Sequence, residues 1–400
     1  MDSRIIIGVL LVCAIVAVAG VLFYSYDFTT PGVNDNNVNT ENSNNSTSNT
    51  TTLPNQVAQT LLPDNQPGPN PGPLPGPFPS PNPSPSPSPG PSPGPSPGPS
   101  PGPGPTPDPT PDPMDKVISL FDAYLKANYD QSLIPSMAVA IVQDGKIIYM
   151  KTLGVKDLVS GALVDKNTLF GIGSNTKSFT AVNVGQLVSA GLMSWDDLLS
   201  KFFSPSDFEL YSDYVTSNMT IRDAFLHRSG LPAYDGDLIW AGFNQPYIDY
   251  ILGKLRYRES NAEFRSKFQY NNLIYALPGY ATENVTNMTW NEFFETNLLK
   301  KLGMTTATTS YYKFMNSSNH VTSYYILSNG TMLPFEVVPD SVGPAGGLFV
   351  SINEMANWLK FQINGTGYYN GVKILNKTEF DETHKGQMYM NDLYKYGFGW

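Results

Sequence analysis

The chain has 400 residues and a net charge of −10, with 12% aromatic and only 14% charged residues. Phosphate binding needs clusters of Lys and Arg, so this balance argues against nucleic acid as a partner. The single cysteine, Cys13, stands in the first apolar run, which excludes an intrachain disulfide and a cysteine nucleophile in the globular part. No metal-ligand spacing is visible, and we expect no metal and no cofactor.

An apolar run of twenty residues, 5–24, opens the chain and is long enough to span a bilayer as a helix. Arg4 precedes the run and no Lys or Arg follows it until Lys116. The excess of positive charge on the N-terminal side places that end in the cytoplasm. We therefore predict a transmembrane anchor over residues 1–26 and a single-pass membrane protein with an extracytoplasmic domain. The alternative is a signal peptide cleaved near Ala17-Val18-Ala19.

Residues 27–113 predict a disordered spacer. Its first part, 27–66, is rich in Asn, Ser and Thr and has too little apolar content to fold. In 67–113, proline alternates with small or polar residues, and proline fixes φ and lacks the amide donor that helices and sheets need. At about 3.1 Å per residue, this part would extend roughly 150 Å as polyproline II.

Residues 114–400 predict one folded domain. Val117, Phe121, Tyr124 and Leu125 repeat at helical spacing and indicate an amphipathic first helix. Two strands, 137–142 and 146–151, then flank Asp144-Gly145, a strong hairpin signal. An amphipathic helix follows over 175–190, ended by Gly191. Further helices are expected at 220–226, 273–284 and 290–299, and further strands at 321–327 and 348–351. The order indicates an α/β fold of the α+β type, with an antiparallel sheet flanked by helices and a helical insertion.

Ser174-Asn175-Thr176-Lys177 is an S-x-x-K motif. Residues three apart on a helix share a face, so the lysine nitrogen can reach the serine hydroxyl. A serine needs such a base to become a nucleophile, and a lysine serves only if its pKa is lowered. Ser310-Tyr311-Tyr312-Lys313 matches the pattern too, but no helical periodicity follows it, so we interpret Ser310 as structural. A simple helix-capping role for Ser174 remains the alternative to catalysis.

Tyr270-Asn271-Asn272 is the second candidate element. A phenol beside a lysine can relay protons, and an asparagine amide can both donate to and accept from a substrate amide. Tyr389-Met390-Asn391 also fits, but only Tyr270 stands directly before a predicted helix. A surface turn is the alternative reading of Tyr270.

Four segments in order resemble the family of class C β-lactamases, DD-carboxypeptidases and related esterases, part of the serine β-lactamase and penicillin-binding-protein superfamily. The resemblance covers essentially all of residues 114–400. The segments are the nucleophile stretch 170–180, the signature Thr-Ile-Arg-Asp-Ala-Phe-Leu-His-Arg-Ser-Gly-Leu-Pro at 220–232, the Tyr-x-Asn stretch 268–283, and the glycine-rich lead into a strand at 344–348.

The resemblance implies that Ser174 attacks a carbonyl and forms an acyl-enzyme. Lys177 and Tyr270 would share the base and acid duties, without an assignment of which takes the first proton, and Asn272 would hold the substrate amide. We interpret His227 as structural because it stands in a Leu-His-Arg-Ser-Gly turn. A Ser-His-Asp triad is the weaker reading, since no Gly-x-Ser-x-Gly elbow is present.

The predicted function is therefore a serine hydrolase acting on amide or ester substrates, as a D,D-peptidase, a β-lactamase or an esterase. Its partner would be a small molecule or a peptide or cell-surface polymer. The alternative is a catalytically inactive surface binding or sensor protein that keeps the fold.

The family also uses a third element, a His-x-Gly or Lys-Thr-Gly on a core strand that supplies part of the oxyanion hole. We recognise no such triplet after Tyr270, and residues 396–400 resemble the stretch that precedes that element. We therefore expect the natural protein to extend beyond Trp400.

Overall fold

The computed structural model describes residues 113–130, 132–240, 248–336 and 338–400. The predicted anchor and almost the whole predicted spacer lie outside these residues. Within the described ranges, no helix is both long and apolar enough to cross a membrane.

The strands pair two by two, and every pair is antiparallel. The pairs are β1 (Ser136–Gln143) with β2 (Lys146–Gly154), β3 (Leu169–Gly171) with β6 (Phe349–Ser351), β4 (Tyr324–Ile326) with β5 (Met332–Pro334), β7 (Tyr368–Tyr369) with β8 (Val372–Lys373), and β9 (Met388–Tyr389) with β10 (Lys395–Tyr396).

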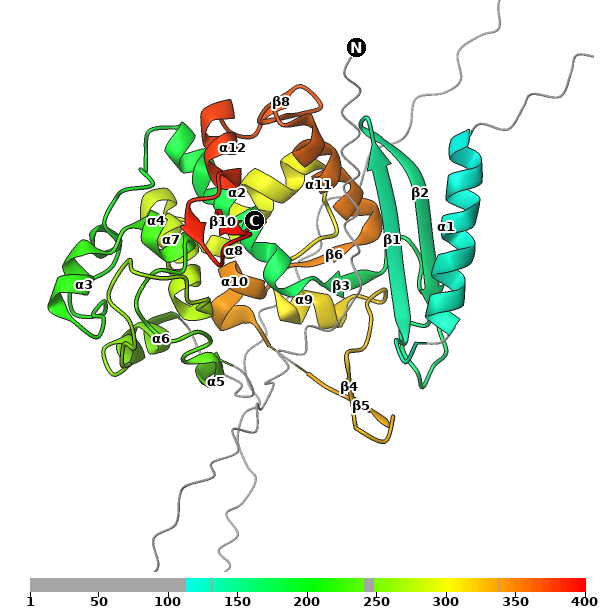
Figure 1. The fold of residues 1–400 in the computed structure, drawn as a ribbon, viewed down its shortest axis with the longest axis horizontal. Coiled ribbons are helices and arrows are strands. Elements are labelled where there is room, and N and C mark those ends of the chain that lie inside the picture. Colours follow the sequence, from blue (N-terminus) through cyan, green and yellow to red (C-terminus); the bar gives the residue numbers. More distant parts are fainter. Residues whose placement is uncertain (1–112, 131, 241–247, 337) are drawn as a thin grey trace, which may run out of the picture. The chain divides into compact units, whose positions relative to one another are not determined.

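The helices connect and cover these pairs (Figure 1). In chain order they are α1 (Pro113–Asp130), α2 (Thr176–Ser189), α3 (Asp213–Asn218), α4 (Ile221–Phe225), α5 (Asp237–Trp240), α6 (Ile248–Leu255), α7 (Asn272–Thr286), α8 (Trp290–Phe294), α9 (Tyr311–Asn316), α10 (Gly343–Gly346), α11 (Ile352–Asn364) and α12 (Lys377–His384). Together with the strand pairs they confirm the predicted fold class.

The β1–β2 hairpin forms where the turn residues predict it. Asp144 and Gly145 both have positive φ, 50° and 72°. A two-residue turn of this kind matches the twist of the strands it joins, and Asp-Gly adopts it at low cost. The register shifts between Ile141 and Val142, where the pairing is irregular.

Alternate residues of β1 face two different helices, as the pleat requires. Met137 and Val139 pack with Leu125 of α1, whereas Val142 packs with Ala356 and Leu359 of α11. Figure 1 accordingly shows α1 on one side of the hairpin and α11 on the other. The hairpin is thus covered by helices that are far apart in the sequence.

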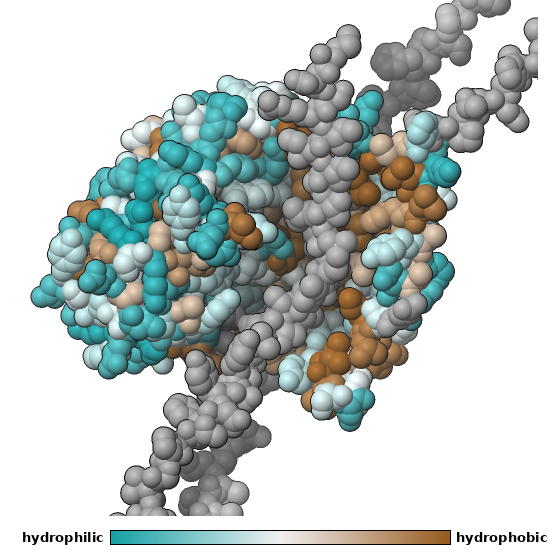
Figure 2. Space-filling view, in the orientation of Figure 1, coloured by the Kyte–Doolittle hydropathy of each residue, from teal (hydrophilic) through white to brown (hydrophobic). Residues whose placement is uncertain are grey.

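The apolar stripe predicted for α1 is only partly correct. Leu125 is buried and Phe121 packs beside it, but Val117 and Tyr124 are 57% and 65% exposed. Leu120 is exposed as well, and Figure 2 shows hydrophobic residues gathered over this side of the molecule. The surface offered by the two strands of the hairpin is narrower than the predicted apolar stripe of α1. Half of the residues of that stripe therefore remain exposed.

The helix predicted over 175–190 forms as α2, but it is not amphipathic. All of its residues from Thr176 to Gly185 are buried, which is typical of a helix at the centre of a core. The hydroxyl groups of its buried Ser and Thr side chains are satisfied because they donate to backbone carbonyls. Thr180 Oγ1 donates to Pro344 O and Ser178 Oγ to Asn175 O. This burial places the first turn of α2 at the heart of the domain.

The Thr-Ile-Arg-Asp segment is organised by the carboxylate of Asp223, which is fully buried. Thr220 caps α4 and exchanges hydrogen bonds with Asp223. The same carboxylate pairs with Arg228 and Arg265, which reach it from further along the chain. A buried charge is tolerated only with such partners. Asp223 therefore fixes the turn that carries His227.

Candidate active site

Three helices bring the predicted site residues together. α2, α7 and α10 pack against one another, left of the centre of Figure 1. Ser174 lies in a short 3-10 turn, Gly173–Asn175, directly before α2, and Lys177 lies in the first turn of α2. Tyr270 precedes α7, and Asn272 is its first residue.

Ser174 is exposed and its hydroxyl has two functional neighbours. Lys177 Nζ lies 3.2 Å from Ser174 Oγ, and the Tyr270 hydroxyl donates to the same oxygen at 2.7 Å. The S-x-x-K spacing thus gives the contact that helical geometry predicts, and α7 supplies the phenol. An accessible oxygen held between an amine and a phenol has the arrangement of an activated nucleophile.

Lys177 is almost completely buried beneath Ser174. Besides Ser174, Nζ donates to Asn272 Oδ1 and to the Ala345 carbonyl, both at 2.7 Å. Burial lowers the pKa of Lys177 to about 7, although the negative charge of Asp237 acts in the opposite direction. A substantial fraction of this lysine is therefore a neutral amine near pH 7.

The pKa of Tyr270 is shifted in the opposite direction to that of Lys177. Burial raises the pKa of Tyr270 to about 12, so the phenol keeps its proton at neutral pH. The ring also lies close to the lysine, with Nζ 4.7 Å from its centroid. These environments move the pKa of the amine down and that of the phenol up, which separates a base from an acid.

His227 holds the Tyr270 turn from beneath. Its carbonyl accepts from Gln269 N, its Nδ1 accepts from Asn271 N at 3.0 Å, and its ring lies 4.4 Å from that of Tyr270. Burial keeps the pKa of His227 well below its usual value, so the ring stays neutral and Nδ1 can accept. These contacts are of the structural kind that the sequence predicts for His227.

The sequence predicts that the Asn272 amide is free to bind substrate, but in the structure the amide is hydrogen-bonded within the protein. Its oxygen accepts from Lys177, and its Nδ2 donates to both carboxylate oxygens of Asp237 at 3.1 Å. Both ends of the side chain are therefore engaged within the protein. A substrate amide would have to displace one of these bonds.

Sequence reasoning missed two groups of this site. The Ala345 carbonyl contributes through the backbone, and its segment was recognised only as a glycine-rich lead into a strand. Asp237 is the first residue of α5, a short helix without a recognisable motif, and lies 35 residues before Asn272. Only the fold brings these groups to Lys177.

The competing motifs have other roles. Ser310 caps α9 by accepting from Lys313 N, and Lys313 Nζ pairs with Glu295. Tyr389 of the other Tyr-x-Asn is 65% exposed on β9. Both findings agree with the interpretation of these matches as structural.

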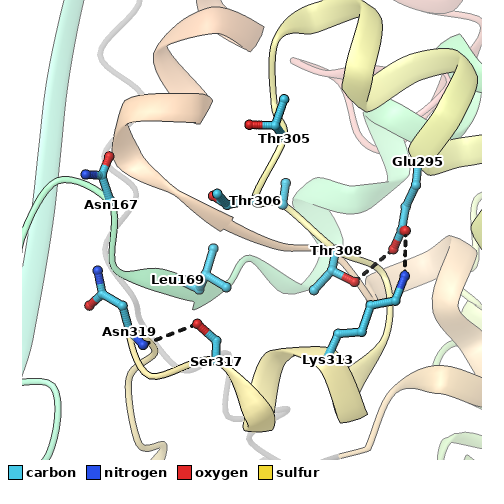
Figure 3. A pocket seen from close by; sticks show the side chains of 10 residues that line it. Asn167, Leu169, Glu295, Thr305, Thr306, Thr308, Lys313, Ser317 and Asn319 are labelled. Carbon is cyan, nitrogen blue, oxygen red and sulfur yellow. Dashed lines mark hydrogen bonds and ion pairs between the residues drawn. The ribbon is translucent and has the colours of Figure 1, made fainter. Parts of the chain in front are cut away.

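Lys313 and Glu295 also line a pocket of about 350 Å³ (Figure 3). None of Ser174, Lys177, Tyr270 and Asn272 contributes to its wall. The Glu295 carboxylate accepts from Thr308 Oγ1 as well as from Lys313, and Ser317 Oγ accepts from Asn319 N. The polar groups of this wall thus bind one another, which gives no reason to place the chemistry there.

The expectation that no His-x-Gly triplet follows Tyr270 is wrong, because His384-Lys385-Gly386 fits the pattern. It stands at the end of α12 and not on a strand. The His384 ring stacks between Phe380 and Trp400, at centroid distances of 4.5 and 4.4 Å. Its surroundings are those of a packing residue.

Comparison with known proteins agrees with this geometry. The family model "Beta-lactamase" matches residues 120–399, and the chain belongs to that family. The resemblance inferred from the four segments is therefore confirmed.

Two relatives have low sequence identity to this chain. The chain is 30% identical to an unguisins hydrolase of Aspergillus campestris over 250 residues, covering 60% of this chain and 46% of that protein. It is 25% identical to protein flp of Staphylococcus aureus over 256 residues, covering 63% and 50%. The chain thus spans about half the length of these relatives.

Two solved structures have a similar fold. The octameric penicillin-binding protein homologue from Pyrococcus abyssi superposes with a TM-score of 0.60 at 23% identity, covering 70% of this chain and 64% of that one. The penicillin-binding protein from Bacillus halodurans gives a TM-score of 0.53 at 23% identity, covering 63% and 74%. The fold of this chain is therefore that of penicillin-binding proteins.

Proposed function

We propose that this protein is a serine hydrolase that forms an acyl-enzyme at Ser174. Ser174 Oγ attacks the carbonyl carbon of an amide or ester while its proton passes to Lys177. The bond to the leaving group then breaks, and the leaving group takes a proton from the Tyr270 hydroxyl, which the protonated Lys177 replaces. Water next attacks the acyl group and releases the acid, which restores the Ser174 hydroxyl.

The surroundings of Lys177 Nζ carry this proposal. A neutral amine has two N–H groups and one lone pair. Asn272 Oδ1 and the Ala345 carbonyl can only accept, so they take the two N–H groups. The lone pair is left facing Ser174 Oγ at 3.2 Å. This arrangement favours Lys177 as the base.

Tyr270 is assigned the acid role, because its raised pKa keeps it protonated. Tyr270→Phe is expected to slow acylation or deacylation by about 10²-fold, the usual contribution of a positioned acid. Only a hydroxyl is removed, so the melting temperature should stay close to that of the wild type. Single-turnover kinetics with an activated ester measures the effect, and wild-type rates would show that the residue is merely part of a turn.

The substrate class is tested by covalent labelling. The named relatives include a hydrolase, and the similar structures are a penicillin-binding protein and a homologue of one, which supports hydrolysis and acylation by β-lactams. A fluorescent penicillin and a chromogenic ester should each label the protein, with the adduct on the peptide that contains Ser174. Turnover rates of β-lactam, D-alanyl peptide and ester then separate the three activities. An unlabelled protein would favour the inactive binding or sensor protein instead.

We also propose that the hydrolase domain lies outside the membrane, held by residues 1–26 and spaced by residues 27–113. The apolar run after Arg4 and the alternating prolines support this arrangement. Protease added to intact cells should cut between residues 27 and 114 and release a soluble domain. Immunoblots of the medium and N-terminal sequencing check the result. A mature N-terminus near Gly20 would instead indicate a cleaved signal peptide.

A further inference from the structure

Asp237 connects to the proposed base through Asn272. It is half-buried at the start of α5, and its two carboxylate oxygens accept from Asn272 Nδ2. The opposite end of the same amide accepts from Lys177 Nζ. A continuous line of hydrogen bonds therefore runs from Asp237 through Asn272 and Lys177 to Ser174.

The orientation of the Asn272 amide matters for the base. An amide side chain is nearly symmetric in shape, but one end donates and the other accepts. Were the amide reversed, its N–H would donate to the lone pair of Lys177, and that lone pair could no longer accept the proton of Ser174. A carboxylate only accepts, so Asp237 binds only the donating end and leaves the oxygen toward Lys177.

We propose that Asp237 is a positioning residue, which holds the Asn272 amide in the one orientation that leaves the lone pair of Lys177 directed at Ser174. The inference rests on the proposed function. Asp237 acts through Asn272 and need not touch the substrate.

The charge of Asp237 gives this role a measurable signature. Its carboxylate raises the pKa of Lys177 against the lowering by burial. Among the described residues, the other titratable groups around Lys177 are Tyr270, Tyr275 and His227. Burial raises the pKa of both tyrosines and lowers that of His227, so all three are neutral near pH 7.

The test compares Asp237→Asn with Asp237→Ala in the full chain. Acylation of Ser174 by an activated ester is followed against pH, and the side-chain signal of ¹³C-labelled Lys177 is titrated by NMR. Asp237→Asn loses the charge, so the acid limb should move to lower pH by about one unit. Its amide can still accept from Asn272 but can also donate to a reversed Asn272 amide, so the plateau rate should fall only partly. Asp237→Ala should show the same shift and also a plateau lowered by about tenfold or more, because the amide is free to turn.

Asp235→Asn is the matched control. Asp235 lies two residues before Asp237, but its carboxylate pairs with Arg258. Its pH profile should match that of the wild type. Superimposable profiles for Asp237→Ala and the wild type would overturn the inference. So would a lower plateau in both Asp237 variants with an unchanged Lys177 titration, which would assign Asp237 to folding alone. If the wild type itself is not acylated, the proposed function fails, and the NMR titration still decides the role of Asp237.

Discussion

Ser174→Ala is expected to abolish covalent labelling and to lower turnover by at least about 10⁴-fold, because members of a cooperating catalytic set cannot replace one another. Ser174 is exposed, so removal of its hydroxyl should leave the core intact. Intact-protein mass spectrometry after incubation with a penicillin or an activated ester measures the adduct directly.

Ser310→Ala serves as the control for the other S-x-x-K match. Its hydroxyl caps α9, so this variant should label like the wild type and lose only a little stability. An adduct on Ser310, or undiminished labelling of Ser174→Ala, would refute the assignment of Ser174.

Lys177→Met is expected to slow acylation by about 10³-fold, within the range of general base catalysis. The wild-type rate should rise with pH through about 7, since the neutral form of Lys177 is the base. The residual rate of Lys177→Met should lack this rise. A rise near the same pH in both proteins would assign it to another group.

The same pair of proteins should differ in the pH dependence of stability. The pKa of Lys177 is about 7 in the folded protein and near the usual lysine value of 10.5 in the unfolded chain. Between these pH values the unfolded chain binds a proton that the folded protein does not. The unfolding free energy of the wild type relative to Lys177→Met should therefore rise with pH, by at most about 1.4 kcal/mol per unit.

Chemical denaturation of both proteins at several pH values measures this difference. It should be constant above about pH 10.5 and below about pH 7, where both states of the wild type carry the same charge on Lys177. A difference that stays constant from about pH 7 to 10 would mean that the folded protein keeps Lys177 protonated there.

The sequence predicts best what depends on neighbours along the chain. The Asp144-Gly145 hairpin and the helical spacing of Ser174 and Lys177 both depend on local geometry, and both form. α11 was not predicted, although Ser351 and Glu354 form a capping box at its start that could have revealed it.

Contacts between distant segments were less predictable. The exposure of Val117 and Tyr124 depends on how wide a surface the hairpin offers, and the burial of α2 depends on the helices that surround it. The role of Asn272 changes for the same reason, since Asp237 reaches it from the start of α5. The contact of Lys177 with the Ala345 carbonyl cannot be predicted from residue types, because every residue has a backbone carbonyl.

The packing of α7 against α10 restricts which residue can stand at position 279. Glycine inside a helix is disfavoured by up to about 1 kcal/mol relative to alanine, so helical propensity alone would favour replacement of Gly279. A Cβ at Gly279 would, however, lie 2.4 Å from Pro344 Cβ. Pro344 directly precedes Ala345, whose carbonyl binds Lys177. A residue at position 279 with a higher helix propensity would therefore displace Pro344 and disturb the hydrogen bond to the proposed base. Selection for activity and selection for helix stability therefore act in opposite directions at Gly279.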